Sequence, residues 1–383
     1  MKIINRIADS FTKVETLPAG IYHLQTELAG APYRLHLRLN EDGSGLLIVN
    51  ASTVLQLNPS AAEYAYHFIR ETPAEETARQ VAARYRVSRE TALQDYHDFV
   101  ERLQTLIATP DLDPVSFLDF ELTAPHSADL TAPLRLDCAL TYHLHPDTSP
   151  EYAPVNRASR ELSTEEWKTI LDRAWDFGIP QVTFTGGEAT LREDLPELIA
   201  KAESNGQVCG LLTDGLKLID REYFSQLLLT GLDHILFLLQ PENPASWQAL
   251  ESVLAEDIFV TVHLTLNREK IPAGEGVLER LSNLGVRSLS LTSSDPALTA
   301  AFDNLRDKAA ELGLTLRFDL PVPYSAHNPV AVETSKDEVP EGAGKAWLYV
   351  EPDGDVLPSQ GMAGKVLGSL LTDSWSTIYP VKG

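Results

Sequence analysis

The segment RELSTEEWKTILDRAWDFGIPQVTFTGGEATLREDLPELIAKAESNG, residues 160–206, alternates helix-like and strand-like sequence and decides the fold class. An amphipathic run begins at a capping box formed by Ser163 and Glu166. A short run of strand-forming residues, QVTFTGG, follows it, and a second amphipathic run ends at Gly206. Helices that flank a short apolar strand are typical of βα units, in which the strands are parallel.

The same alternation continues on both sides of this segment. Further apolar runs separated by helical stretches read LRLDCALT, VCGLLTDG, HILFLLQ, FVTVHLTL, SLSLT and TLRFDLPV. Six or seven βα units in series predict an α/β fold with a parallel sheet, either doubly wound or curled into a full or partial barrel. We expect a partial (β/α) TIM-type barrel over residues 134–323. Ligands of such folds meet the C-terminal ends of the strands, so functional residues are expected on the loops that follow them.

The regions that flank the barrel have a different character. Residues 33–58, YRLHLRLNEDGSGLLIVNASTVLQLN, predict a β-hairpin, and helix starts follow at Asn58, at a capping box from Thr72 to Glu75, and at Ser88. A hairpin with three helices predicts a small winged-helix-like α+β domain over residues 1–107. Residues 108–133, rich in Pro, Asp and Thr, predict a linker, and residues 324–383 predict a short C-terminal β-hairpin appendage around AWLYVEPDGDVLPS.

The composition excludes several classes of partner. The 383 residues include 31 Lys and Arg against 55 Asp and Glu, a formal net charge of −24, which repels nucleic acid and anionic membrane surfaces. No apolar run has the length of a membrane span, and the first twenty residues lack the apolar core of a signal peptide. We therefore expect a cytoplasmic protein that binds neither nucleic acid nor membrane.

Cysteine is scarce in this chain. Cys138 and Cys209 are its two cysteines, so neither a disulfide framework nor a cysteine-rich zinc or iron–sulfur site can be built from it. Both lie in strand-like apolar runs, where cysteine usually behaves as a small buried hydrophobe.

The local motif that most suggests binding is FTGGEATL, residues 184–191, at the end of a predicted strand. Gly186 and Gly187 would let the backbone come close to a ligand, and Glu188 could hold a cationic group such as an α-amino group. The alternative is a tight turn with a solvated glutamate.

Three consecutive pieces of the chain resemble one family. Residues 160–215, with the GGE motif, resemble the core of peptide-modifying radical S-adenosylmethionine (SAM) enzymes, and weaker similarity continues to Leu320. Residues 35–107 resemble the PqqD-like domain that recognises leader peptides, and residues 341–359 resemble the start of the SPASM or twitch region. The family's GGE motif contacts the methionine amine of SAM, so the resemblance implies a residual SAM site at Gly186, Gly187 and Glu188.

The first cluster site of that family is not conserved in sequence here. The family holds a [4Fe-4S] cluster with C-x3-C-x2-C in the loop after the first strand, and other residues do not replace these thiolates without loss of the cluster. Ungapped threading puts the three ligand positions at Leu144, Thr148 and Glu151. No change of register helps, because no cysteine lies between Cys138 and Cys209.

The tail departs from the family in the same way, since Glu341 and Ser359 stand where its pattern has cysteines. Reductive cleavage of SAM needs an electron delivered through a cluster. The resemblance therefore implies a cluster-less protein, not an active radical SAM enzyme on its own. We expect it to bind a leader or precursor peptide and to act as scaffold, chaperone or regulatory partner of an active modifying enzyme. Residual SAM binding by the GGE turn and a purely structural role for that turn both stay open.

The loop TYHLHPDTSPEY, residues 141–152, supports a different class of function. His143 and His145 form an H-x-H pattern similar to that of amidohydrolases, and imidazoles are good zinc ligands. Such a site would need further ligands, for which His263 and Asp319 are the candidates. The alternatives to a peptide-binding scaffold are therefore a metal-dependent hydrolase on this loop, or an enzyme that uses SAM without its own iron–sulfur cluster. A polar surface loop is the simpler interpretation of the two histidines.

Overall fold

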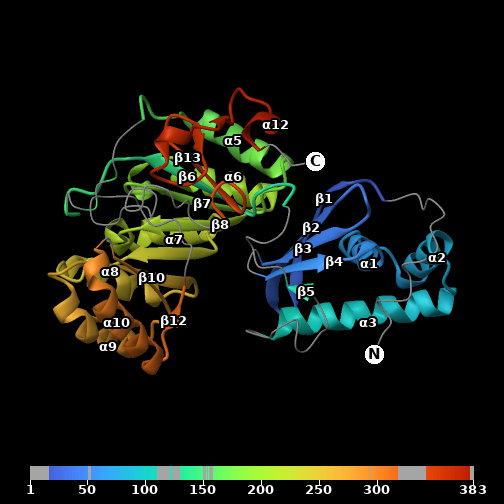
Figure 1. The fold of residues 1–383 in the computed structure, drawn as a ribbon, viewed down its shortest axis with the longest axis horizontal. Helices are drawn as coiled ribbons and strands as arrows, with labels where there is room; N and C mark the ends of the chain where they lie inside the picture. The colour runs from blue at the N-terminus through green and yellow to red at the C-terminus, as the bar shows by residue number, and fades with distance from the viewer. Residues whose placement is uncertain are drawn as a thin grey trace. The chain divides into compact units, whose positions relative to one another are not determined.

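The computed structural model describes residues 17–50, 53–109, 121–122, 130–149, 152, 154, 158–293, 295–317 and 342–379. The chain forms two compact units, Met1–Ala128 and Asp129–Gly383 (Figure 1). No helix among the described residues is both long and apolar enough to cross a bilayer.

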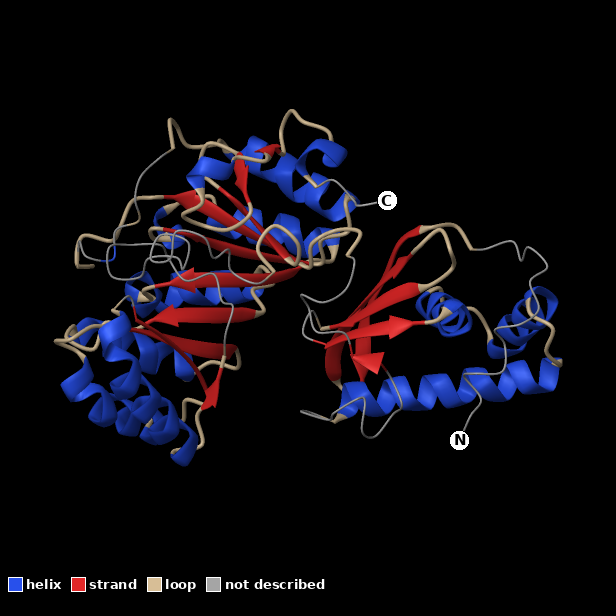
Figure 2. Cartoon of the chain, in the orientation of Figure 1, coloured by secondary structure: helices blue, strands red, loops and turns tan. Residues whose placement is uncertain are grey.

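The smaller unit is an antiparallel sheet with helices on one side (Figure 2). Its sheet has the order β1-β2-β3-β4-β5, and its core joins leucines of the central strands to aromatic side chains of the helices. The strands are β1 (Gly20–Leu28), β2 (Ala31–Leu39), β3 (Gly45–Val49), β4 (Thr53–Leu57) and β5 (Glu121–Leu122), and the helices are α1 (Pro59–Ile69), α2 (Ala74–Arg84) and α3 (Arg89–Ala108).

The helix starts of this unit agree with the sequence in two cases of three. The side chain of Asn58 caps α1 by accepting from the backbone N–H of Ala61, and Ser88 caps α3. The expected capping box from Thr72 to Glu75 is wrong. Helix α2 begins after Pro73, which has no side chain to accept a hydrogen bond, and no side-chain cap forms.

The predicted hairpin is the middle of a larger sheet. β2 and β3 pair as expected, but β1, which the sequence analysis missed, covers the outer edge of β2 along its full length. On the other side β3 pairs with β4, and β5 covers only Leu55 and Gln56 of β4. In the described part of this unit, the sheet edges are therefore the outer side of β1, the outer side of the two-residue strand β5 and the part of β4 that β5 does not cover.

The larger unit is a mixed α/β fold with a largely parallel sheet. Its strand order is β12-β11-β10-β9-β8-β7-β6-β13-β14-β15. Neighbouring strands from β12 to β13 pair in parallel, whereas β14 pairs antiparallel with both β13 and β15. The strands are β6 (Arg135–Thr141), β7 (Gln181–Gly186), β8 (Val208–Thr213), β9 (His234–Leu238), β10 (Phe259–Leu266), β11 (Ser288–Ser293), β12 (Thr315–Leu316), β13 (Trp347–Val350), β14 (Asp355–Leu357) and β15 (Gly368–Ser369). The helices are α5 (Thr164–Asp176), α6 (Leu195–Asn205), α7 (Arg221–Leu229), α8 (Pro244–Leu254), α9 (Gly274–Asn283), α10 (Thr299–Glu311) and α12 (Trp375–Ile378).

The two faces of this sheet differ in chemistry. Alternate residues such as Val182 and Phe184 join the apolar core shared with the helices. The residues between them face the other way and are often polar, and Thr183, Thr185 and His263 are examples that are almost fully buried. The sequence places this polar face opposite the helices because its strands alternate polar and apolar residues.

The C-terminal hairpin belongs to this sheet and is not a separate appendage. β13 and β14 form the expected hairpin, with Gly354 at a positive φ of 96° in its turn. β13 also pairs in parallel with β6, placing Trp347 opposite Arg135. All four residues of β13 are buried, and β6 and β14 occupy its two edges.

Candidate functional site

The loops after β6 and β7 are packed against each other at the C-terminal ends of the strands. The backbone N–H of Gly187 donates to the carbonyl of Thr141 at 2.7 Å, and that of Glu188 donates to the carbonyl of His143 at 2.8 Å. The GGE turn is thus attached to the same loop in which the family would place its cluster ligands.

Both glycines of this turn are required by contacts within the chain. A Cβ on Gly186 would lie 2.1 Å from the carbonyl oxygen of Thr141, and the residue has φ of +130°. A Cβ on Gly187 would lie 2.2 Å from the carbonyl oxygen of His143. The sequence analysis expected these glycines to admit a ligand, whereas the close approach that they permit here is to the chain's own backbone.

Glu188 is not the solvated glutamate of a surface turn, since only 1% of it is exposed. Its Oε1 accepts from the backbone N–H of Thr190 at 3.0 Å, from the Thr190 hydroxyl at 2.6 Å and from the Thr213 hydroxyl at 2.8 Å. Its Oε2 accepts from the backbone N–H of Asp214 at 2.8 Å. The carboxyl group is therefore held rigidly between the ends of β7 and β8.

A second buried carboxylate, Asp214, lies next to Glu188. Asp214 follows β8, is 3% exposed, accepts from the backbone N–H of Leu216 at 3.0 Å and accepts from the hydroxyl of Thr148. Burial, and then the negative charge of Asp214, raise the pKa of Glu188 to about 8. Among the described residues, neither carboxylate has a Lys, Arg or His ion-pair partner.

Asp214 was missed as a site residue by sequence reasoning, because the TDG pattern is typical of a turn. A signal was nevertheless available. TDG follows the strand after the GGE strand, and parallel neighbours bring their C-terminal ends to the same edge of the sheet.

The side chains of the two histidines in the loop after β6 have partners other than this acidic pair. His143 has a side chain that is 80% exposed and lies 3.8 Å from a Glu161 oxygen. His145 lies 3.9 Å from Asp147. Both carboxylates belong to the loop or to its immediate surroundings, so the contacts resemble those of a polar surface loop.

The expected additional ligand His263 has other partners. Its Nδ1 lies 3.1 Å from the Ser290 hydroxyl and its Nε2 lies 3.2 Å from the hydroxyls of Thr265 and Thr292. Burial lowers the pKa of His263 to about 3, so the ring is neutral over the physiological range. Asp319, the other expected ligand, lies outside the described residues.

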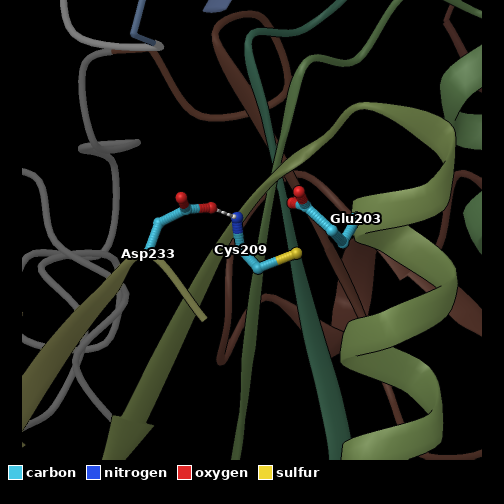
Figure 3. A group of neighbouring side chains, drawn as sticks. All are labelled: Glu203, Cys209 and Asp233. Carbon is cyan, nitrogen blue, oxygen red and sulfur yellow. Dashed lines mark hydrogen bonds between the residues drawn. The ribbon is translucent and has the colours of Figure 1, made fainter. Parts of the chain in front are cut away.

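Within the described ranges, the group of three potential ligand side chains close enough to share an ion is Glu203, Cys209 and Asp233, whose ligand atoms lie within 4.8 Å of one another. Figure 3 shows the Cys209 sulfur pointing toward Glu203, while Asp233 accepts from the backbone N–H of Cys209 at 2.7 Å. The group lies at the start of β8, at the opposite end of that strand from Asp214. Asp233 thus already has a structural role, and we assign no metal to this group.

The hydrolase alternative predicts stoichiometric bound metal, whereas the surroundings of the two histidines predict little. Protein purified without added metal should contain far less than stoichiometric zinc or iron, because His143 and His145 have no third ligand nearby in the described structure. Elemental analysis should give the same value for the wild type and for the His143→Ala, His145→Ala double variant. Stoichiometric metal that is lost in the double variant would establish the hydrolase site instead.

The residues present at the family's cluster position do not fit a [4Fe-4S] cluster. Leu144 offers no ligand atom, the Thr148 hydroxyl is hydrogen-bonded to Asp214, and Glu151 lies outside the described residues. Cys138 lies within β6 in the core shared with the helices, and burial raises the pKa of its thiol. A cluster needs thiolates, and this loop offers none.

The tail position does not offer a thiolate either. Ser359 is buried and lies 3.4 Å from the indole N–H of Trp347, which fits a structural hydroxyl. Glu341 lies outside the described residues.

Comparison with known proteins relates the larger unit to one superfamily. Residues 138–250 match the family model of the radical SAM superfamily. The PqqA peptide cyclase of Xanthomonas oryzae pv. oryzae is 29% identical over 229 residues, which cover 52% of this chain and 59% of that protein. The PqqA peptide cyclase of Ruegeria pomeroyi is 29% identical over 269 residues, covering 62% of this chain and 69% of that protein.

Solved structures agree on the fold. SuiB of Streptococcus suis aligns with a TM-score of 0.56 at 15% identity, covering 96% of this chain and 89% of that one. SuiB has also been solved bound to S-adenosylmethionine and bound to the precursor peptide SuiA, the latter with a TM-score of 0.57 at 14% identity, covering 90% of this chain and 87% of that one. Together the matches support a radical SAM, peptide-modifying family and a fold consistent with a partial TIM-type barrel.

Proposed function

We propose that this chain is a cluster-less relative of peptide-modifying radical SAM enzymes, which binds a leader or precursor peptide and serves as scaffold or regulatory partner of an active modifying enzyme. One observation carries the proposal. The stretch from Cys138 to Cys209, which includes the whole loop after β6, contains no other cysteine. A chain that keeps the GGE turn but has no thiolates keeps part of the family's SAM site and lacks the cluster that delivers the electron for SAM cleavage.

The GGE turn supports residual binding of SAM. When Glu188 is ionised, its Oε2 accepts a single hydrogen bond from the described residues, so one of its lone pairs is left for an ammonium donor. A protonated amine would also offset the charge of the adjacent Asp214. This arrangement favours, as a second candidate function, an enzyme that binds SAM without its own cluster. A calorimetric titration of the full chain with SAM distinguishes binding from a purely structural turn.

Peptide capture is assigned to the smaller unit through β-augmentation, in which an extended peptide adds a strand to a sheet edge. β1 covers one side of the predicted hairpin, and of the edges in the described part of the sheet we choose the one along β4. The pairing of Gln56 with Glu121 in β5 supports this choice, because β4 already accepts a short antiparallel strand there. We expect a peptide to replace β5 and to extend along β4 beside α1.

A reversible crosslink tests this edge in the full chain. Cysteines at Gln56 and Glu121, which are register partners, should form a disulfide that fixes β5 on β4. The native cysteines Cys138 and Cys209 are buried and should not interfere. The probe is a peptide selected for binding to the full chain from a displayed library of extended peptides. Calorimetry should show that the oxidised variant loses at least about tenfold in affinity and that reduction restores it.

A control crosslink separates edge blocking from general rigidity. Cysteines at Gln25 and Arg34 would join β1 to β2 inside the sheet and leave β4 free, so oxidation should not change peptide affinity. Equal affinity for the oxidised and reduced forms of the β4–β5 variant would contradict capture at β4. A library that yields no binder would contradict the peptide-binding function itself.

A further inference from the structure

The loop after β6 reaches over the ends of the next strands. In its fully described part, residues 142–149, the Thr148 hydroxyl donates to the carboxylate of Asp214, which follows β8. The backbone N–H of Ser149 donates to Oε1 of Gln240, which follows β9, at 3.4 Å. The side-chain amide of Asn243, the N-cap of α8, donates to the carbonyl of Asp147 at 3.4 Å.

The other end of the segment is anchored independently. The Tyr142 hydroxyl lies 3.2 Å from the Tyr349 hydroxyl and donates to Glu351 at 3.1 Å, and both partners belong to β13 or follow it directly. The carbonyl of His143 accepts from the backbone N–H of Glu188. The segment therefore runs from β13, past the GGE turn, to the ends of β8 and β9.

We propose that residues 142–149 form a strap that closes over the Glu188–Asp214 end of the sheet and must release from Asp214 before a ligand reaches Glu188. The position of the ligand at Glu188 rests on the proposed function. The closure rests on the contacts of residues 142–149 alone. The loop that binds the cluster in the family would, in this chain, instead close over Glu188.

The strength of closure depends mainly on Thr148. Thr148 and Asp214 are 7% and 3% exposed, so their hydrogen bond is shielded from water and one partner is charged. The hydrogen bonds from Ser149 to Gln240 and from Asn243 to Asp147 are longer, at 3.4 Å each. Gln240 is held in place, since its backbone N–H donates to the Ser246 hydroxyl at 3.1 Å. Removal of the single Thr148 hydroxyl should therefore shift the opening equilibrium of the strap.

Hydrogen–deuterium exchange of the full chain, read by mass spectrometry, tests the strap without any ligand. Thr148→Val keeps the volume of the side chain and removes the donor, so exchange of the amides in residues 142–149 should accelerate about tenfold or more. Asp147→Asn is the matched control. The Asp147 side chain is 76% exposed and its backbone carbonyl stays in place, so exchange should match the wild type.

A second variant guards against misfolding of the first. Asp214→Asn keeps an oxygen that can accept from the backbone N–H of Leu216 and removes the charge that strengthens the Thr148 bond, so it should accelerate exchange in the same segment. Wild-type rates in both variants, or fast exchange of this segment in the wild type, would overturn the strap.

Binding kinetics of SAM separate the strap from the proposed function. The Thr148→Val variant should bind SAM with a faster association rate than the wild type, in proportion to the change in exchange. If neither protein binds SAM but the exchange rates differ, the SAM site fails and the strap stands. If both bind SAM at equal rates and exchange equally, the strap fails and the SAM site stands.

Discussion

The free energy of unfolding of the larger unit is expected to fall by about 2 kcal/mol between about pH 6.5 and pH 8, and Glu188→Gln should remove most of this fall. In the folded chain burial raises the pKa of Glu188 to about 8, while its ordinary value is 4.5. Between these values the folded state binds a proton that the unfolded state releases. Stability is therefore greatest below the unfolded pKa and is lost as the pH rises through the folded one.

The pH window is chosen to exclude two histidines. Burial lowers the pKa of His234 to about 4 and that of His263 to about 3. For such groups the unfolded state binds the extra proton, so their contribution rises with pH and levels off above about pH 6.5, and it is the same in the wild type and in Glu188→Gln. Above that pH, any difference between the wild type and Glu188→Gln in how the free energy of unfolding changes with pH is due to titration of Glu188.

Urea unfolding followed by tryptophan fluorescence provides the measurement, because all five tryptophans belong to the larger unit. Glu165→Gln is the control, since Glu165 lies on α5 with a side chain that is 81% exposed. It should keep the wild-type slope. A wild-type stability that is flat from about pH 6.5 to pH 8 would show that Glu188 is ionised in the folded chain, contrary to its buried environment.

Gly187→Ala should destabilise the larger unit by about 3 kcal/mol, a cost in the upper range for overpacked sites. The new Cβ would lie 2.2 Å from the carbonyl oxygen of His143 and 2.8 Å from backbone carbons of the same loop. Backbone atoms cannot move aside as a flexible side chain does, so the turn and the loop must separate. The backbone hydrogen bond from Glu188 to His143 would be weakened with them.

A glycine without neighbours is the matched control for this substitution. Gly276 lies within α9, and a Cβ there meets nothing within 4 Å. Gly276→Ala should therefore stabilise the unit by roughly 0.5–1 kcal/mol through helix propensity. A urea midpoint for Gly187→Ala equal to that of the wild type would show that the turn does not depend on its packing against the loop after β6.

Local sequence patterns predicted the individual strands and helix starts of the fold. Period-two and helical periodicities identified the runs that became β6 to β11, and capping chemistry identified the starts of α1, α3 and α5. Long-range pairing was not predictable in this way. The pairing of β13 with β6 joins Trp347 to Arg135 across more than half of the chain, and no local signal encodes a partner so distant.

The position of Glu188 after β7 was predictable from the sequence, but its environment was not. The GGE motif identified Glu188, and the strand-end rule placed it correctly. The burial of Glu188 depends on Thr213 and Asp214 of the neighbouring strand, which only the parallel register brings beside it. The pairing of β7 with β6, which places Gly186 opposite Thr141, explains why two glycines expected to face a ligand contact the preceding loop instead.

Whether this chain can hold an iron–sulfur cluster and cleave SAM is measured by anaerobic reconstitution of the full chain with iron and sulfide. A visible spectrum and an assay for 5′-deoxyadenosine with SAM and a reductant follow the reconstitution. A radical SAM enzyme with all three loop cysteines, treated identically, provides the positive control. We expect no cluster absorbance above that of adventitious iron and no 5′-deoxyadenosine, because the chain has no thiolate in the loop after β6. A stoichiometric iron–sulfur spectrum with SAM cleavage would contradict this expectation.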